Sequence, residues 1–260
     1  MEVKKKYKTG IVLSGGAARG FAHAGVLYAL NEEGIFPDVI SGVSAGAIVG
    51  AFYADGYKPE DLLDLFIEKN MWSFVKPALP KNGILRMTGM EEVLSGHLRA
   101  RRFSDLKIPL YITATDFLAG KPEYFHEGEL IPRIIASSSI PVMFVPSIIN
   151  NRMYVDGGLV DNLPVEPILD QCEMLIGVHV NPTGHVENVD GLVHIAERSF
   201  HLAIGSDIER KIAWFDIFIE PTELKQFGLM DVKRAREMYG IGYREAKKIL
   251  GECAKSGASA

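Results

Sequence analysis

The segment from Asp38 to Gly50 constrains the fold of this chain more than any other stretch. It reads Asp-Val-Ile-Ser-Gly-Val-Ser-Ala-Gly-Ala-Ile-Val-Gly, so a short apolar run meets a serine flanked by glycines and then resumes with small residues. The pattern predicts a strand, a sharp turn and a helix, with the Ser44 hydroxyl exposed at the turn and Gly42 and Gly46 making room for it. At a helix N-terminus, partial positive charge favours an alkoxide-like nucleophile. A nucleophilic serine is one interpretation, and an ordinary tight turn is the other.

The elements around this segment predict a parallel sheet. Residues 10–14 indicate a buried strand, 15–20 a glycine-rich loop, and 21–33 a helix that ends at Gly34. A second strand at 39–41 precedes the turn, and a second helix runs to about residue 55. Strand, helix, strand and helix in this order favour parallel strands joined by right-handed crossovers.

Composition indicates an ordinary globular protein. The chain has 260 residues, 47% hydrophobic and 23% charged, with a net charge of −5, which gives no electrostatic reason to expect nucleic acid as a partner. We expect one domain over 1–260, with a basic leader at 1–8 and a flexible tail at 256–260. No apolar run suggests a signal peptide or membrane span, and Cys172 and Cys253 are isolated, so we expect a cytoplasmic location.

The remainder of the chain alternates helices and strands. Thr88 and Glu91 have the spacing of a capping box at the start of a helix. The periodicity predicts helices at 59–70, 88–99, 129–138, 192–214 and 231–253, and strands at 110–117, 123–125, 153–155, 174–180 and 216–220. The strand at 123–125 is expected to form a hairpin with the one before it.

The glycine-rich loop is a candidate source of backbone N–H groups for an oxyanion, because it follows a strand expected beside the strand of Ser44. Two nucleotide-binding interpretations compete. A dinucleotide fingerprint requires glycine where Ala17 stands and an acidic residue where Ile40 and Ser41 stand. A phosphate-binding P-loop requires a Gly-Lys-Ser/Thr ending, which is missing here.

The base that would activate Ser44 is the harder assignment. In principle it could be a histidine that follows Ser44, namely His179, His185, His194 or His201. Yet Ser44 follows only the second strand, unlike the serine of an α/β-hydrolase, and none of these histidines lies at an obvious catalytic turn. Asp156 is favoured because it leaves a strand directly into Gly157 and Gly158, whose bare backbone lets a carboxylate project into a crowded site. Asp161 is a weaker rival.

Three blocks in this order resemble the signatures of the patatin-like phospholipase family: Leu-Ser-Gly-Gly-Ala-Ala-Arg-Gly at 13–20, Gly-Val-Ser-Ala-Gly at 42–46 and Asp-Gly-Gly at 156–158. Segments 136–141 and 162–164 add to the similarity, which covers about residues 8–181. The resemblance implies a three-layer α/β/α sandwich with a mostly parallel central sheet. It also implies a hydrolase with a serine-aspartate dyad that cleaves acyl esters of lipids.

Carried onto this sequence, the resemblance makes Ser44 the nucleophile and Asp156 the base. It assigns the oxyanion site to the backbone of Gly15, Gly16 and Ala17. The residues it implies for shaping the loops are Arg19, Gly20, Gly42, Gly46, Gly157 and Gly158. One departure is Ala17, where the family usually has a third glycine, so its N–H can serve only if the backbone tolerates a Cβ. The implied partners are a lipid or fatty-acyl ester and a membrane surface touched peripherally, with no metal and no cofactor.

Other functions use the same residues. A thioesterase or acyltransferase acting on acyl carriers differs only in its leaving group and acceptor, and an acyl-binding regulatory module would keep the fold without turnover. Ser104 and Lys107 have the SxxK spacing of a serine-lysine amidase, without supporting blocks. Two apolar segments could contact an acyl chain or simply pack: Met71, Trp72, Phe74, Val75, Ala78 and Leu79, and Met143, Phe144 and Val145.

Overall fold

The protein is described by a computed structural model covering residues 5–68, 76–77, 85–182, 184, 191, 195, 198–200, 202, 208–228 and 231–257. Within these ranges the chain forms one eight-stranded sheet in the order β10-β9-β1-β2-β5-β8-β7, with β6 paired to β5. Its strands are β1 Tyr7–Leu13, β2 Val39–Val43, β5 Leu110–Asp116, β6 Lys121–Phe125, β7 Ser147–Ile149, β8 Arg152–Asp156, β9 Cys172–Val178 and β10 Ile217–Ile219. A separate pair joins β3 Lys76–Pro77 and β4 Leu85–Arg86.

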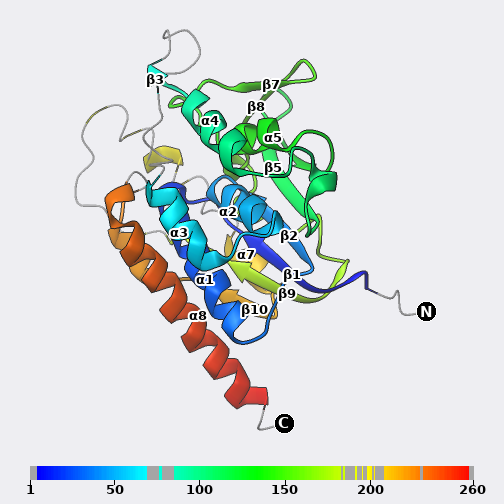
Figure 1. The fold of residues 1–260 in the computed structure, drawn as a ribbon, viewed down its shortest axis with the longest axis vertical. Coiled ribbons are helices and arrows are strands. Elements are labelled where there is room, and N and C mark those ends of the chain that lie inside the picture. Colours follow the sequence, from blue (N-terminus) through cyan, green and yellow to red (C-terminus); the bar gives the residue numbers. More distant parts are fainter. Residues whose placement is uncertain are drawn as a thin grey trace.

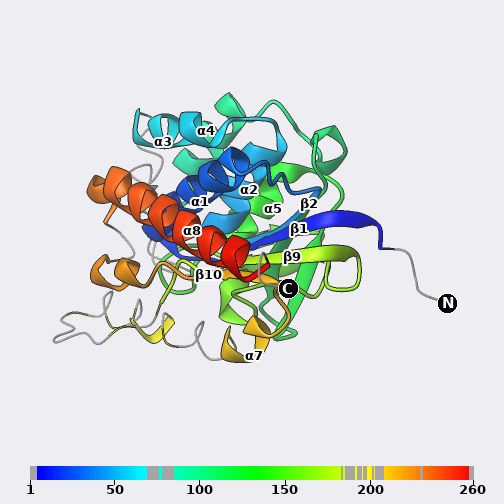
Figure 2. The ribbon, with the colours of Figure 1, turned by 90° about the horizontal axis from the view of Figure 1, so that it is seen from below.

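Helices flank both faces of this sheet. Figure 2 shows α1, α2, α3 and α8 on one face and α7 on the other. The helices are α1 Phe21–Glu32, α2 Ala45–Ala54, α3 Pro59–Glu68, α4 Thr88–His97, α5 Leu130–Ser137, α7 Ile208–Ile212 and α8 Ala235–Gly257. The three-layer α/β/α prediction is confirmed.

The central strands are parallel. β1 pairs in parallel with β2 and β9, β2 with β5, and β10 with β9, whereas β6 and β8 run antiparallel to β5. The carboxyl ends of β1, β2 and β9 therefore meet at one edge of the sheet, where ligands of open α/β sheets commonly bind. The glycine-rich loop and Ser44 both leave the sheet at this edge.

Alternating residues of each strand build two separate cores. Ile11 and Leu13 of β1 join the large cluster under α1, α2 and α8, while Val12 joins the cluster on the opposite face. Figure 1 shows α8 running beside α1 along much of its length, and Met238 and Ile241 of α8 are part of the large cluster. Strands with both faces covered explain the nearly continuous apolar runs in the sequence.

Several local predictions differ from the structure. β1 already begins at Tyr7, inside the expected leader, because Tyr7 pairs with Cys172 of β9. The Thr88 capping box is wrong: Met87 is the N-cap residue, no side chain caps the helix, and Thr88 itself is helical. Strand β7, which pairs with β8, was not predicted. The helix expected over 192–214 lies partly outside the described residues, and the described part includes α7.

Candidate active site

Ser44 lies at the sharp turn between β2 and α2 that the sequence predicts. Its φ of 51° and ψ of −119° are unusual for a residue with a side chain. The strain therefore falls on the serine itself, since neither Gly42 nor Gly46 has a positive φ. Strain of this kind persists where surrounding structure enforces it and is common at functional sites.

Gly46 is required for close packing rather than for an unusual dihedral angle. A Cβ at this position would stand 2.2 Å from the carbonyl oxygen of Leu13, at the end of β1. The first turn of α2 can approach the glycine-rich loop only because position 46 is bare. Crowding is similar at Gly20, Gly42 and Gly157, where a Cβ would stand 2.6, 2.7 and 2.3 Å from its nearest neighbour.

A serine in α5 holds the turn in place. The Ser44 amide donates to Ser137 Oγ at 2.8 Å, and the Ser137 hydroxyl donates to the Thr113 carbonyl of β5 at 2.6 Å. Both bonds are buried, so they tie the turn to the sheet. Sequence reasoning assigned no role to Ser137, although a run of serines at the end of an apolar helix was a visible signal.

Strand register brings Asp156 level with Ser44. Val43 pairs with Thr113 and Asp156 pairs with Ala114, so the serine after Val43 and the aspartate flank β5 at the same height. The chain then crosses directly over β5, because a Cβ at Gly157 would stand 2.3 Å from the Thr113 carbonyl oxygen. Residues far apart in sequence thus meet through the order β2-β5-β8.

The Asp156 carboxyl is 1% exposed and has no cation beside it among the described residues. Burial raises its pKa to about 7, and hydrogen bonds from Ser44 and from the Gly158 amide oppose that rise. Asp156 Oδ1 accepts the Gly158 N–H at 2.8 Å, whereas Oδ2 has no well-aligned partner within the described parts of the chain. The loose contact to Ser44 suits a catalytic hydrogen bond that tightens with substrate.

The glycine-rich loop forms a short 3₁₀ turn, Ala17–Gly20, beside Ser44. Ala17 adopts the left-handed region at φ 47°, despite its Cβ. The Gly15 amide donates to Asn162 Oδ1 at 3.1 Å and is therefore engaged, while no described residue accepts the amides of Gly16 and Ala17. Of the three N–H groups predicted for the oxyanion, two remain available in this structure.

Two buried side chains support this loop from behind. The Arg19 guanidinium donates to the Phe227 carbonyl at 2.7 Å and to Asn181 Oδ1 at 2.8 Å. His23 Nε2 lies 2.8 Å from the Ser14 carbonyl oxygen, and burial lowers the pKa of its imidazole to about 4, so the ring is neutral and Nε2–H is the donor. Arg19 and His23 thus tie the glycine-rich loop to neighbouring segments of the fold.

Asn162 is a buried residue of the site to which sequence reasoning gave no role. Its Oδ1 accepts from Gly15, and its Nδ2 is buried with no acceptor among the described residues. A Cβ at Gly158 would stand 2.8 Å from Asn162 Oδ1 and 3.0 Å from Asp156 Oδ1, so the asparagine and the aspartate flank the same narrow space. Its position shortly after the Asp-Gly-Gly turn was the available signal.

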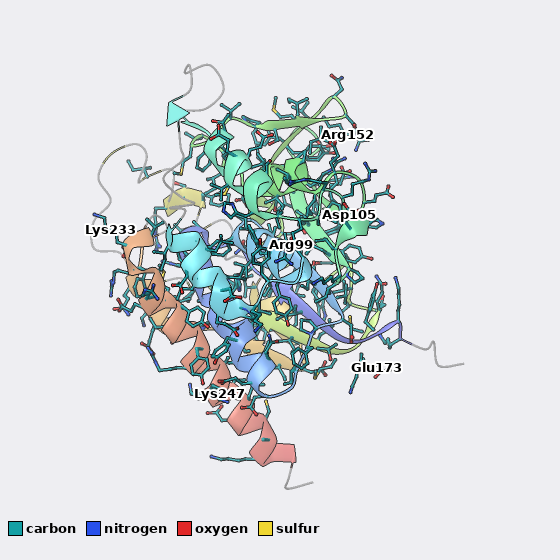
Figure 3. The ribbon with its side chains drawn as sticks, viewed as in Figure 1. Arg99, Asp105, Arg152, Glu173, Lys233 and Lys247 are labelled. Atoms are coloured by element: carbon teal, nitrogen blue, oxygen red, sulfur yellow. The ribbon has the colours of Figure 1, made fainter. Side chains whose placement is uncertain are left out.

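These groups line one small cavity. Its walls are Gly15, Gly16, Ala17, Ser44, Ile140, Asp156, Asn162 and Phe200. The space is about 10 Å³, close to the minimum for one water molecule. Ile140 packs with Met143, Phe144 and Phe200, so an apolar cluster borders the reactive groups. The charged residues Arg152 and Lys247 are not part of its wall, and Figure 3 shows them well apart from each other, Arg152 near β8 and Lys247 on α8.

Comparison with known proteins agrees with this arrangement. Residues 11–169 match the family described as patatin-like phospholipase. The chain belongs to that family. It is 33% identical over 177 residues to an uncharacterized NTE family protein of Mycobacterium bovis, covering 67% of this chain and 49% of the relative. It is 27% identical over 277 residues to Lysophospholipase NTE1 of Kluyveromyces lactis, covering 93% of this chain and 19% of the relative.

The fold of this patatin-like chain also matches a solved structure. VipD from Legionella pneumophila superimposes with a TM-score of 0.57 at 16% identity, over 95% of this chain and 67% of that one. The chain spans about half the length of one curated relative and about a fifth of the other. Those relatives therefore contain regions that this sequence does not match.

The rival site residues of the sequence analysis lie elsewhere in this patatin-like fold. His179 Nδ1 pairs with Glu220 Oε1 at 2.6 Å and is not part of the cavity wall. Asp161 is held by Lys211, and Ser104 and Lys107 are exposed. His185, His194 and His201 lie outside the described residues, as do Met71, Trp72, Phe74, Val75, Ala78 and Leu79.

The described residues contain no group of three or more His, Cys, Asp or Glu side chains arranged to hold a metal ion. None of their helices is long and apolar enough to cross a membrane.

Proposed function

We propose that the chain is a serine acyl hydrolase that cleaves a fatty-acyl ester of a lipid, with Ser44 as nucleophile and Asp156 as base. The observation that carries this proposal is the shared cavity, which a serine in a strained turn lines together with a buried carboxylate that no cation among the described residues neutralises. A carboxylate with a pKa near 7 can accept the serine proton at neutral pH, without a histidine between them.

The proposed reaction has two steps. Asp156 accepts the proton of Ser44 as its hydroxyl attacks the ester carbonyl, and the amides of Gly16 and Ala17 donate to the oxyanion. The Ser44 ester forms, and the leaving alcohol takes the proton from Asp156. Water then attacks the acyl-enzyme, Asp156 takes its proton, and the fatty acid departs as Ser44 is restored. Gly15 holds the loop through Asn162 rather than donating to the oxyanion.

The substrate class is argued from the apolar border of the site. Ile140, Met143, Phe144 and Phe200 lie next to the reactive groups, as an acyl chain requires. The cavity is too small for a substrate, so Ile140 or Phe200 must move before an ester can enter. Val142 lies on the same loop as Ile140 and is 58% exposed. In this proposal Val142 contacts the membrane surface. The relative from Kluyveromyces lactis is named a lysophospholipase, which supports a lipid ester as substrate.

The test is a chain-length series of p-nitrophenyl esters, with lysophospholipid and acyl thioester as further substrates. Wild type should hydrolyse esters and be labelled at Ser44 by a fluorophosphonate, and Ser44→Ala and Asp156→Asn should fall to background. Preference for the thioester would instead make the chain a thioesterase. Neither labelling nor turnover, with lipid present, would favour an acyl-binding module. A cytoplasmic location, suggested by two isolated cysteines, is tested by fractionation.

A further inference from the structure

Two buried polar atoms belong to residues that line the cavity, and they are chemically complementary. Asn162 Nδ2 is a donor and Asp156 Oδ2 is an acceptor, and each lacks a well-aligned hydrogen bond among the described residues. The side chains are 5% and 1% exposed. Buried polar groups are nearly always satisfied, so a donor with no described partner, beside a carboxylate that Ser44 contacts only loosely, points to a ligand that both would bind.

The orientation of the Asn162 amide is fixed by its neighbour. The Gly15 N–H can only donate, so the atom 3.1 Å from it must be the amide oxygen, and Nδ2 must face away. The flanking backbone is held firmly: Asp161 pairs with Lys211, and the Pro164 carbonyl accepts from Ser41 Oγ at 2.5 Å. Asn162 therefore presents its donor from a rigid support.

The cavity that the two residues share has room for a single oxygen atom. The cavity has about the minimum volume for one water molecule, and an oxygen there can accept from Asn162 Nδ2 while donating its proton to Asp156 Oδ2. In the proposed reaction the leaving alcohol oxygen and the attacking water each exchange a proton with Asp156. Because the second step reverses the geometry of the first, both oxygens occupy the same place.

We infer that Asn162 Nδ2 binds the oxygen that exchanges its proton with Asp156, namely the leaving oxygen in acylation and the attacking water in deacylation. This inference rests on the proposed function. In deacylation the water oxygen bonds to the acyl carbon and its proton goes to Asp156 Oδ2. The Ser44 Oγ–acyl bond then breaks, and Ser44 regains the proton from Asp156. Asn162 contributes a donor that holds the water in line with the acyl carbon.

The two half-reactions separate this role from simple support of Gly15. p-Nitrophenolate leaves without assistance, so acylation by a p-nitrophenyl ester does not need Asn162, whereas deacylation by water does. Because Asn162→Ala also removes the acceptor for Gly15, we expect the burst rate and the fluorophosphonate labelling rate of Ser44 to fall, but by less than the deacylation rate. Deacylation should slow by about tenfold or more, as expected for loss of one hydrogen-bond donor. Intact mass spectrometry should show the acyl-enzyme accumulating.

Two further variants complete the design. Asn31→Ala is the matched control, because Asn31 Oδ1 accepts from Tyr53 on α2, far from the cavity, and all rates should remain as in wild type. Asn162→Asp keeps the side-chain volume and the acceptor for Gly15 but loses the donor. Measured on the plateau of its pH profile, it should also deacylate slowly, and it replaces the alanine variant if that one does not fold.

Three outcomes have distinct meanings. Equal slowing of labelling, burst and deacylation would overturn the inference and make Asn162 a support for Gly15 alone. Deacylation at the wild-type rate in either Asn162 variant would overturn it too. If wild type shows neither labelling nor a burst, the proposed function itself fails. This outcome is seen in wild type alone, whereas the role of Asn162 is tested by differences between wild type and the variants.

Discussion

Asp156, the last residue of β8, and Asp161, five residues later, have opposite surroundings. Asp156 and Asp161 are 1% and 6% exposed, so both carboxylates are buried. Asp161 is 2.6 Å from Lys211 Nζ and accepts the Tyr124 hydroxyl at 2.9 Å, whereas Asp156 has only the Gly158 amide and the loosely placed Ser44 hydroxyl. The difference shows that two equally buried carboxylates can have different roles. A carboxylate paired with a cation anchors the chain, whereas one without a cation can accept a proton.

Electrostatics follow the same division. Burial raises the pKa of Asp156 to about 7, and no cation among the described residues counters it. Burial also raises the pKa of Asp161, but there the Lys211 ammonium acts in the opposite direction. Lys211 further contacts Glu166 and the Leu163 carbonyl, so one lysine of α7 fixes the stretch that carries Asn162. The contacts of Lys211 thereby help to position Asn162 beside the cavity.

The largest contrast is expected in activity. Asp156→Asn should lower ester hydrolysis by about 10³-fold or more, because the amide cannot accept the Ser44 proton. The same change at Asp161 should leave the folded fraction active and labelled at Ser44. Initial-rate assays at pH 8 on both variants, with thermal denaturation to confirm folding, test the comparison. An active Asp156→Asn variant would remove Asp156 from the mechanism.

Stability should show the reverse order. Lys211→Met leaves Asp161 as a buried carboxylate without its cation, which typically costs about 3–5 kcal/mol of unfolding free energy. Denaturant unfolding at pH 8 measures this loss, and adding Asp161→Asn to the same chain should recover part of it. A Lys211→Met protein as stable as wild type would mean that the ion pair does not anchor the segment.

The pH dependence isolates Asp156. Its native pKa of about 7 lies above its ordinary value of 3.8, so between these values the folded state binds the extra proton. Stability attributable to Asp156 is therefore complete below pH 4 and declines as pH rises to 7, by an amount of the order of 4 kcal/mol.

Activity should move in the opposite direction. The value of kcat/KM should rise through pH 7, because only the ionised carboxylate is a base. Unfolding free energies and initial rates measured from pH 4 to 9 check both trends. Asp156→Asn is the control, and its stability should lack this component of the decline. A flat wild-type rate profile between pH 6 and 8 would contradict the unpaired state of Asp156.

The smallest effect concerns strain at the reactive end. Ala17 has φ 47°, a left-handed conformation that costs a residue with a side chain about 1–2 kcal/mol. Ala17→Gly should raise the unfolding free energy by up to about 1 kcal/mol, after the entropy lost by glycine on folding. Ester hydrolysis should change less than about threefold, because glycine keeps the same N–H. Loss of stability in this variant would show that the loop is not strained.

Much of the candidate site could be predicted from the sequence because its motifs depend on residues close together in the chain. The turn at Ser44, the glycine-rich loop, and the bare backbone after Asp156 each require particular small residues at fixed spacing. The helix over 21–33 and its end at Gly34 follow from periodicity and a left-handed terminal glycine, which has φ 71° in the structure. Local sterics decide such features, so local sequence predicts them.

Other features depend on partners distant in the chain. Ser137 beneath the turn, Asn162 against Gly15, and Lys211 against Asp161 were assigned no role, because each acquires one only from a neighbour at least 50 residues away. The hydrogen bond from the Gly15 amide to Asn162 was not predicted for the same reason. A side chain's hydrogen-bond partner is set by the sheet order and register, which periodicity does not reveal.

The sequence by itself determined the strand-turn-helix around Ser44, the two glycine-dependent loops and the α/β class, because backbone sterics and apolar period act within a few residues. Tertiary structure decided which buried carboxylate has a lysine beside it and which has no cation among the described residues. That choice follows from where α7 places Lys211 and from how the chain crosses β5 at Gly157. Charge pairing inside a protein depends on distance in space, and no spacing along the chain encodes it.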